Sequence, residues 1–198
     1  MGQGSPTRSG PGQVLPVPPS QGPRPLGPCP VVELVDAGGV PLGELPVDRA
    51  HTPPGRLHRA FSVLVTDADG RVLLQRRSRA KSRFAGLWSN ACCGHPGPGQ
   101  DLAGAAAGRL LAEMGLRIDH LVELGRFVYR ARDPASPFEE HEYDHVFLGS
   151  TGRDPRPDPD EADAWRWAGP GALAVDLAVR PERHTPWLGR VLSFLPDA

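Results

Sequence analysis

Apolar residues alternate with polar ones, or form short continuous runs, in several segments of the chain. Such patterns, bounded by turn-forming residues, predict β-strands. The predicted strands are Val31–Val35, Ala60–Val65, Arg71–Arg76, Leu121–Ala131, Glu139–Gly149 and Trp165–Trp167. Asp and Gly in the segments Asp36–Gly39 and Asp67–Gly70 tolerate the backbone angles of tight turns, so we expect a hairpin at each of these two places.

One segment has the composition of a helix rather than a strand. Asp101–Met114 is rich in Ala and Leu, begins with a residue that caps helix N-termini, and is followed by Gly115, a common C-terminal cap. Further helices are predicted near Pro170–Ala178 and Pro186–Phe194. Because strands and helices alternate, the fold class is α/β or α+β with a mixed sheet.

The first 30 residues do not fit this pattern. They contain 6 Gly and 9 Pro but no acidic or aromatic residue, and they cannot bury enough apolar surface to offset the entropy of folding. We therefore expect a disordered Pro/Gly-rich extension at residues 1–30 and one domain at residues 31–198. A proline-rich docking motif for an SH3-like partner is the alternative for the extension.

Composition argues against several functional classes. Lys plus Arg total 22 and Asp plus Glu total 23, a formal charge of -1 that disfavours nucleic-acid binding. No apolar run reaches the roughly 18 to 20 residues of a membrane span, and no signal peptide is apparent, so we expect a soluble, cytoplasmic protein. Cys29, Cys92 and Cys93 are too few for a disulfide framework and are expected to be free thiols.

Side chains that can bind a metal ion gather in a few segments. Five of the seven histidines, which are His51, His58, His95, His141 and His145, are grouped with the carboxylates of Glu140 and Glu142. In a strand, Glu140 and Glu142 point to one face and His141 to the other, which puts two carboxylates about 7 Å apart. Such a pair favours a cation between them, although a solvated acidic strand edge is the alternative. Three imidazoles and two carboxylates suit Zn²⁺, Mn²⁺, Fe²⁺ or Mg²⁺, and the sequence does not choose among these.

Basic residues cluster after the third predicted strand. Arg76, Arg77, Arg79, Lys81 and Arg83 lie within eight residues. Guanidinium and ammonium groups donate charge-assisted hydrogen bonds to phosphate oxygens, so this loop could hold a diphosphate. The alternative is a solvated basic loop.

The segment from Gly94 to Leu116 resembles the NUDIX box, Gly-x5-Glu-x7-Arg-Glu-U-x-Glu-Glu-x-Gly-U, where U is a bulky aliphatic residue. The matching positions are Gly94, Leu110, Glu113, Gly115 and Leu116. The positions that differ are Gln100, Gly108, Arg109 and Ala112, and they include acids with which NUDIX hydrolases bind metal ions. The resemblance implies a Nudix-like α/β/α sandwich with a mixed sheet, and it argues against ordinary NUDIX hydrolysis.

A longer resemblance runs from about residue 31 to about residue 190. The matching segments are His51-Thr52, Arg56–Ser62, Leu74–Arg77 with Lys81, Trp88–Pro96, Glu113–Gly115, Phe127–Ala131, Glu140–Asp144 and Thr185–Trp187. These segments, taken together and in this order along the chain, resemble the type I, flavin-independent isopentenyl-diphosphate Δ-isomerases. The resemblance implies an isomerase of isoprenoid biosynthesis that interconverts isopentenyl diphosphate and dimethylallyl diphosphate by a 1,3-allylic proton shift, and needs no flavin.

The same resemblance implies roles for individual residues. Catalytic roles fall to the Cys93 thiol on one face of the substrate, Glu142 with Tyr129 on the other, and the Trp187 indole over the developing cation. A site for Mn²⁺ or Zn²⁺ would use His51, His58, His95, Glu140 and Glu142. Mg²⁺ would contact Glu113 and the Cys93 carbonyl, and the diphosphate would bind Arg77, Lys81 and Arg109.

One position departs from this family. Its members commonly have a phosphate-binding Lys four residues before the first histidine ligand, where this chain has Val47, and Arg49 is the candidate replacement. Two other functions compete with the isomerase: a NUDIX-type diphosphohydrolase and a non-catalytic metal-binding module. We expect a small-molecule substrate, no nucleic-acid or membrane partner, and a monomer.

Overall fold

The computed structural model describes residues 7–16 and 31–196. Its strands are β1 (Thr7–Pro16), β2 (Val31–Val35), β3 (Pro41–Pro46), β4 (His58–Thr66), β5 (Val72–Arg77), β6 (Trp88–Ser89), β7 (Cys92–Gly94), β8 (His120–Arg132), β9 (Glu139–Ser150) and β10 (Ala162–Ala168). Its helices are α1 (Val47–His51), α2 (Leu102–Met114), α3 (Pro170–Val179) and α4 (Leu188–Leu192), with a short 3₁₀ turn, η1 (Pro181–Arg183).

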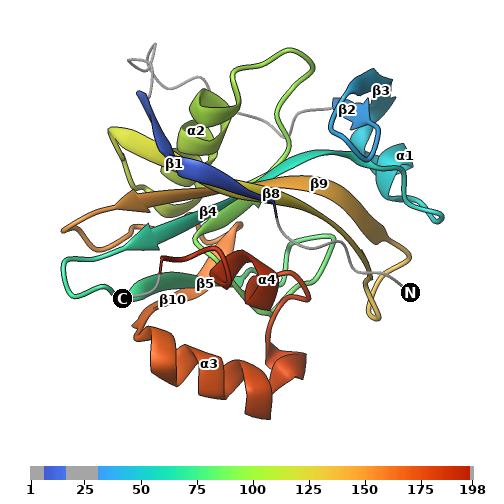
Figure 1. Cartoon of the computed structure of the whole chain (residues 1–198). Coiled ribbons are helices and arrows are strands. Elements are labelled where there is room, and N and C mark those ends of the chain that lie inside the picture. Colours follow the sequence, from blue (N-terminus) through green and yellow to red (C-terminus); the bar gives the residue numbers. More distant parts are fainter. Residues whose placement is uncertain (1–6, 17–30, 197–198) are drawn as a thin grey trace.

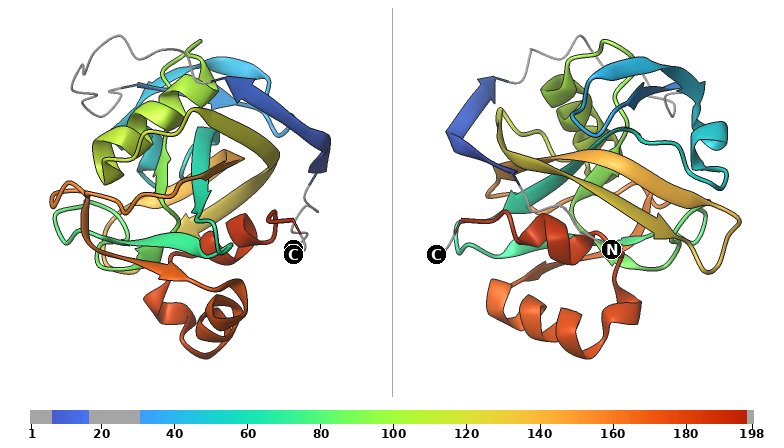
Figure 2. Two further views of the ribbon diagram at one scale, coloured as in Figure 1. Left: turned by 90° about the vertical axis from the view of Figure 1, so that its left-hand side faces the viewer. Right: turned by 45° about the vertical axis from the view of Figure 1, so that its right-hand side comes forward.

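A mixed β-sheet runs through the centre of the molecule, in the order β1-β8-β9-β4-β2-β3 (Figure 1). The β4–β9 pair is parallel, whereas the other pairs along this path are antiparallel. Helix α2 covers one side, and α3 and α4 lie on the other (Figures 1 and 2). The fold class predicted from the sequence is therefore confirmed.

Apolar side chains form a core on each side of the sheet. Beside α2, the side chains of Phe61, Leu110 and Met114 are fully buried, and beside α4 the core includes Leu64 and Leu188. Burying one such side chain contributes about 1.5 to 3 kcal/mol to folding. The strand β4 contributes to both cores because its successive side chains alternate between the two faces.

Helix α2 begins and ends where the sequence predicts. The carboxylate of Asp101 accepts a hydrogen bond of 2.8 Å from the Gly104 N–H, which satisfies one of the free donors of the first turn. Gly115 follows with φ of 65°, a left-handed conformation that favours glycine. These two residues fix the length of the helix.

The second predicted hairpin is wrong in its pairing. The turn forms, with the Asp67 N–H bonded to the Arg71 carbonyl, but β4 and β5 share only the Thr66–Val72 pair among the described residues. Beyond that pair, β4 aligns with β9 and β7, while β5 aligns with β10 and β6. Neighbours distant in sequence therefore outcompete the local hairpin. The first hairpin, β2–β3, is confirmed.

Several elements lie where the sequence predicts none: the short strands β6 and β7, helix α1 and strand β1. Helix α1 is only five residues long, too short for intrinsic propensity to reveal it. Strand β1 falls inside the segment expected to be disordered, and its backbone pairs with β8 from Thr7 to Pro16. Backbone hydrogen bonds to an open sheet edge require no particular side chains, so composition did not reveal the strand. Residues 1–6 and 17–30 lie outside the described part of the chain.

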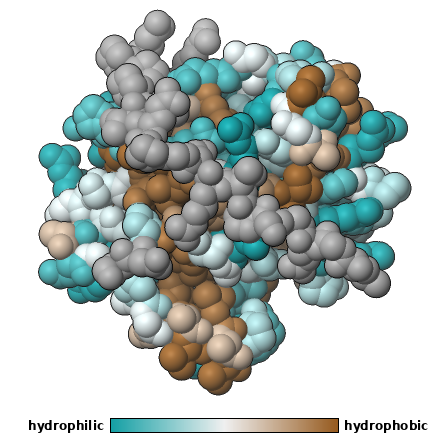
Figure 3. Space-filling view, in the orientation of Figure 1, coloured by the Kyte–Doolittle hydropathy of each residue, from teal (hydrophilic) through white to brown (hydrophobic). Residues whose placement is uncertain are grey.

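The surface of the molecule is polar except for a few patches. Apolar residues gather over α3, where Val175 and Val179 are largely exposed (Figure 3). Among the described residues, no helix is both long and apolar enough to cross a membrane.

Candidate active site

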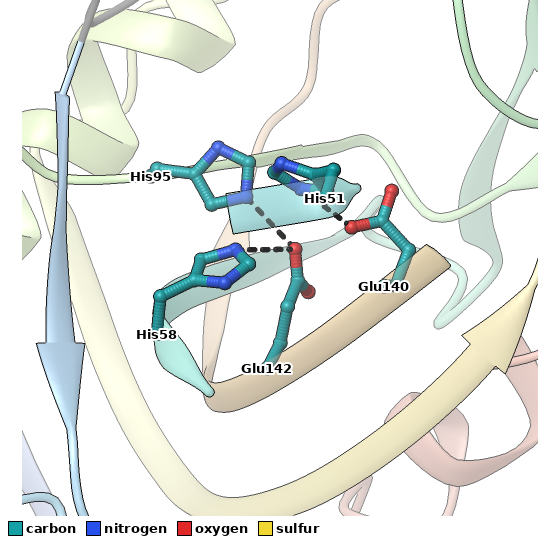
Figure 4. Close-up of side chains that lie close together, drawn as sticks. All are labelled: His51, His58, His95, Glu140 and Glu142. Carbon is teal, nitrogen blue, oxygen red and sulfur yellow. Dashed lines mark hydrogen bonds and ion pairs between the residues drawn. The ribbon is translucent and has the colours of Figure 1, made fainter. Parts of the chain in front are cut away.

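Five side chains that can bind a metal ion converge on one point. One ligand atom from each lies within 4.8 Å of all the others (Figure 4), and the residues are His51, His58, His95, Glu140 and Glu142. All five were predicted from the sequence as one site. They come from four places in the chain, so their convergence is a product of the fold.

The sheet and two flanking segments bring these residues together. Parallel pairing of β4 with β9 sets His58 opposite Glu142. Strand β7 pairs with β4 and ends at Gly94, immediately before His95. Helix α1 ends at His51, which is fully buried. As predicted, Glu140 and Glu142 share one face of β9.

Backbone carbonyls orient two of the imidazoles. The Nδ1 of His51 lies 2.6 Å from the Val47 carbonyl, and the Nδ1 of His58 lies 2.7 Å from the Arg56 carbonyl. Since a carbonyl only accepts, each Nδ1 carries a proton, and each Nε2 is the ring nitrogen aimed at the centre. This arrangement is typical of histidines that bind metals.

Several polar atoms in this cluster lack a hydrogen bond. The Nε2 atoms of His51 and His58 and the Oε2 atom of Glu140 are buried without such a partner, although His51 Nε2 lies 2.8 Å from Glu140 Oε2. Buried polar atoms without partners are costly, and a cation would satisfy all three together. The donor set therefore fits a divalent metal ion.

Protonation differs among the residues of the cluster. Burial alone would lower the pKa of His58, but the hydrogen bond and the charge from Glu142 outweigh it and raise that pKa. Burial lowers the pKa of His95 to about 4, so this imidazole is neutral at pH 7. Burial alone would raise the pKa of Glu142, but hydrogen bonds and charges from His58 and His95 outweigh it and hold that pKa well below its usual range. Neutral imidazole and ionised carboxylate are the forms that coordinate metals.

A cavity of about 700 Å³ opens beside the cluster. Its lining residues are Val47, Arg77, Ala80, Lys81, Ser82, Arg83, Cys93, Gly94, His95, Arg109, Tyr129, Glu140, Glu142, Asp160, Glu161 and Trp187. Aromatic and thiol side chains thus share one cavity with the carboxylates of the cluster and with several cations. Its size is that of a small-molecule site.

The Cys93 thiol contacts two polar side chains. Its Sγ lies 3.3 Å from the Asn90 Oδ1, which accepts its hydrogen bond, and 3.5 Å from the Ser62 Oγ. Burial, with the charge of Asp144 adding to it, raises the pKa of Cys93 to about 12, so the group is a thiol at neutral pH. Cys92 and Cys93 are both free, as predicted, whereas Cys29 lies outside the described residues.

Tyr129 and Glu142 form a hydrogen-bonded pair at the cavity. They face each other across β8 and β9, and the Tyr129 hydroxyl donates to Glu142 Oε2 at 2.6 Å. Burial and the neighbouring carboxylates raise the pKa of Tyr129 well above its usual value. The phenol therefore keeps its proton and holds one carboxylate oxygen in place.

The indole of Trp187 is buried between aromatic side chains. Its ring lies 5.1 Å from that of Phe84, edge to face, and 5.8 Å from that of Tyr129. The indole Nε1 donates to Asn90 Oδ1 at 3.2 Å, the same oxygen that accepts from Cys93. Asn90 thus orients the indole and the thiol together, a role that the sequence did not assign to it.

The three cations predicted to bind a diphosphate all line the cavity, and each already has a partner. The Arg77 guanidinium donates through Nε and Nη2 to the Arg83 carbonyl, at 3.3 and 2.9 Å. Lys81 and Arg109 each form an ion pair with Glu161, which the sequence did not single out. Nothing in the short acidic loop around Glu161 indicated from the sequence that this residue pairs with the two cations.

Arg49 is exposed and does not line the cavity, whereas Val47 does. The cation at this wall is Arg83, whose Nε donates to Glu140 Oε1 at 2.9 Å. Whether Arg49 replaces the missing Lys therefore stays a prediction. Val47 places an apolar side chain in the lining of the cavity.

Glu113, expected to contact Mg²⁺, is a buried residue of α2 and does not line the cavity. Its carboxylate pairs with Arg109 and accepts a hydrogen bond of 3.2 Å from Gln75 Nε2. With its oxygens engaged in this way, Glu113 does not form a ready metal site by itself. Its role toward Mg²⁺ stays a prediction.

Comparison with known proteins places the chain among NUDIX proteins. The NUDIX domain family matches residues 56–191. The chain is 51% identical over 167 residues to the "Isopentenyl-diphosphate Delta-isomerase" of Nocardia farcinica, covering 84% of this chain and 95% of that protein. It is 43% identical to the protein of the same name from Halorhodospira halophila, with coverage of 84% and 95%.

Solved structures agree on the fold. DR0079 from Deinococcus radiodurans aligns with a TM-score of 0.67 and 20% identity, covering 82% of this chain and 97% of that chain. The MutT protein from Methanosarcina mazei aligns with a TM-score of 0.55 and 18% identity, covering 69% and 91%. At this identity the likeness concerns the fold alone.

Proposed function

Because the chain belongs to the isopentenyl-diphosphate Delta-isomerase family of NUDIX-domain proteins, we propose that it interconverts isopentenyl diphosphate and dimethylallyl diphosphate. The reaction is a 1,3-allylic shift, in which one proton is added to an alkene carbon and another is removed from the allylic carbon. The observation that carries the proposal is a cavity lined by two separate proton-handling groups, the Cys93 thiol and the Tyr129–Glu142 pair.

The two groups act on opposite faces of the substrate. One donates a proton while the other accepts one, and their roles exchange when the reaction runs backward. Tyr129 donates its hydrogen bond to Glu142 and sits beside it in the proton relay. Cys93 rests as a thiol, held by Asn90 and Ser62, and so begins the cycle with its proton in place.

A carbocation that forms during the shift needs stabilisation. The face of Trp187 supplies this, because an indole attracts a cation by about 1 to 2 kcal/mol in a desolvated environment. Phe84 and Asn90 hold the indole in place, so it does not reorganise when the charge develops.

The His and Glu cluster would hold a divalent ion, which we propose to be Mn²⁺ or Zn²⁺. When bound, such an ion withdraws electron density from the carboxylates and makes the Glu142 system a better acid. Arg77, Lys81 and Arg109 would bind the diphosphate, accompanied by Mg²⁺ near Glu113 and the Cys93 carbonyl. We further propose that the protein works in the cytoplasm as a monomer without flavin.

A single experiment tests the proposal. Purified protein is incubated with isopentenyl diphosphate and Mg²⁺ in D₂O, with Mn²⁺ or Zn²⁺ added in parallel, and the products are followed by NMR. We expect dimethylallyl diphosphate that carries deuterium. Release of inorganic phosphate would instead support the diphosphohydrolase, and unchanged substrate with folded protein would refute the isomerase.

A further inference from the structure

Four charged side chains meet at one end of the cavity. Lys81 and Arg109 supply two positive charges, and Glu113 and Glu161 supply two negative charges. Glu161 contacts both cations, with Oε2 paired to Lys81 and Oε1 lying 3.3 Å from Arg109 Nη2. The formal charge of this group is therefore zero.

The backbone around Glu161 is fixed rather than loosely placed. The Glu161 N–H donates to the Asp158 carbonyl at 3.0 Å, and the Glu161 carbonyl accepts from the Ser78 N–H at 2.9 Å. The Asp158 N–H in turn donates to the Glu113 carbonyl at 2.9 Å. The loop before β10 is thus attached both to the end of β5 and to the end of α2, and it aims the Glu161 side chain at the cations.

Glu161 is ionised at neutral pH. Burial alone would raise its pKa, but the hydrogen bond from Lys81 and the charges of Lys81 and Arg109 outweigh that effect and lower it. Its carboxylate presents two anionic oxygens to the same two cations that a diphosphate would need. A diphosphate that binds both cations therefore competes with these ion pairs.

Of the two carboxylates, Glu161 is the one able to leave. Its side chain is 25% exposed and lines the cavity, whereas that of Glu113 is 1% exposed and also accepts from Gln75. Glu113 further lies on α2 one helical turn after Arg109, a spacing at which the two side chains are neighbours on the helix surface.

We propose that Glu161 is a built-in counter-anion, which occupies the diphosphate subsite of the free protein and leaves Lys81 and Arg109 when a diphosphate enters. The inference rests on the proposed function, in which these two cations bind the substrate diphosphate. Glu161 acts through the cations and is a positioning residue. Its effect is to reduce the positive charge of the empty subsite, so that singly charged anions gain little by entering.

The test is the binding of inorganic pyrophosphate to the full-length protein, measured by titration calorimetry without added Mg²⁺. Glu161→Gln keeps the shape of the side chain but removes the competing charge. We expect pyrophosphate to bind this variant about three- to tenfold more tightly than the wild type, since ion pairs at partly exposed sites are worth about 1 kcal/mol. Loss of a merely structural contact would not tighten binding.

Asp160→Asn is the matched control. Asp160 is exposed and lines the same cavity, but it forms no ion pair with either cation, and the variant loses the same charge. We expect its pyrophosphate affinity to change less than about twofold, because screened charges that do not touch contribute little. Thermal unfolding of both variants would verify that they are folded.

Each outcome of these titrations either supports or overturns the inference about Glu161. Unchanged or weaker pyrophosphate binding by Glu161→Gln would overturn the inference and leave the proposed function standing. Equal tightening in Asp160→Asn would also overturn it, because the effect would then belong to the overall charge. If neither the wild type nor Glu161→Gln binds pyrophosphate, either without Mg²⁺ or after its addition, Lys81 and Arg109 do not form a diphosphate subsite, and the inference fails with that assignment.

Discussion

The hydroxyl of Tyr129 offers the sharpest test of the proton relay. Tyr129→Phe removes one oxygen atom, which donates to Glu142 Oε2 at 2.6 Å in a buried site. The aromatic ring would keep its stacking on Phe127, whose centre is 5.5 Å away, and its contact with Trp187 at 5.8 Å. The change therefore removes the hydrogen bond while leaving the packing intact.

The expected magnitude follows from that bond. A hydrogen bond to a charged group contributes about 1.5 to 3 kcal/mol. Removing its donor costs more than this net value when the acceptor stays buried, because the desolvation of the acceptor is then uncompensated. If this interaction is strongest as the proton moves, kcat should fall about ten- to a hundredfold, and KM should change little. Steady-state kinetics with isopentenyl diphosphate would measure both constants.

The chain carries its own control, because it has only two tyrosines. Tyr143 lies on the neighbouring strand and is also buried, but its hydroxyl donates to the Gly38 carbonyl at 3.3 Å. Tyr143→Phe should keep nearly full activity. A kcat for Tyr129→Phe within about twofold of the wild type would show that the Glu142 contact does not matter for turnover, and the relay would have to be abandoned.

Three further outcomes follow from the site. Cys93→Ala and Glu142→Gln should each abolish turnover without unfolding the protein, and near-normal activity in either variant would remove that residue from the mechanism. His51→Ala should lose the bound divalent ion, as measured by elemental analysis, while His141→Ala, whose imidazole bonds to a loop carbonyl instead, should retain it; equal loss in both would refute the assigned ligands. Because burial raises the pKa of Cys93 to about 12, its thiolate should become abundant only as the pH approaches that value. Alkylation at pH 8 should therefore be slower than that of glutathione, and a rate as fast would contradict the buried thiol.

Local patterns were sufficient for most of the secondary structure. The caps of α2, at Asp101 and Gly115, are short-range signals that act within one turn of helix, and they determine its ends wherever the helix packs. The alternation along β9 likewise put Glu140 and Glu142 on one face before any fold was known. In contrast, α1 and β1 depend on contacts with distant segments, and the sequence did not predict them.

The pairing of strands could not be decided locally. The turn after β4 predicted a hairpin, but β4 has β9 and β7 as its main partners. Parallel pairing with β9 is what sets His58 against Glu142, so the metal-binding cluster depends on the contact that the local pattern missed. The resemblance to a family identified the residues of the cluster, whereas the pairing of strands in the sheet sets the distances between them.

The sequence by itself determined most of the longer elements, the reactive residue types and the resemblance from which their roles were inferred. The tertiary structure decided what each group contacts. Asn90 accepts hydrogen bonds from the Cys93 thiol and the Trp187 indole, Arg83 donates to Glu140, and Glu161 pairs with Lys81 and Arg109. The physical reason is the distance along the chain over which each kind of interaction acts. Helix caps and strand alternation act over a few residues and leave a pattern along the chain, whereas charge pairs join residues distant in sequence and leave none.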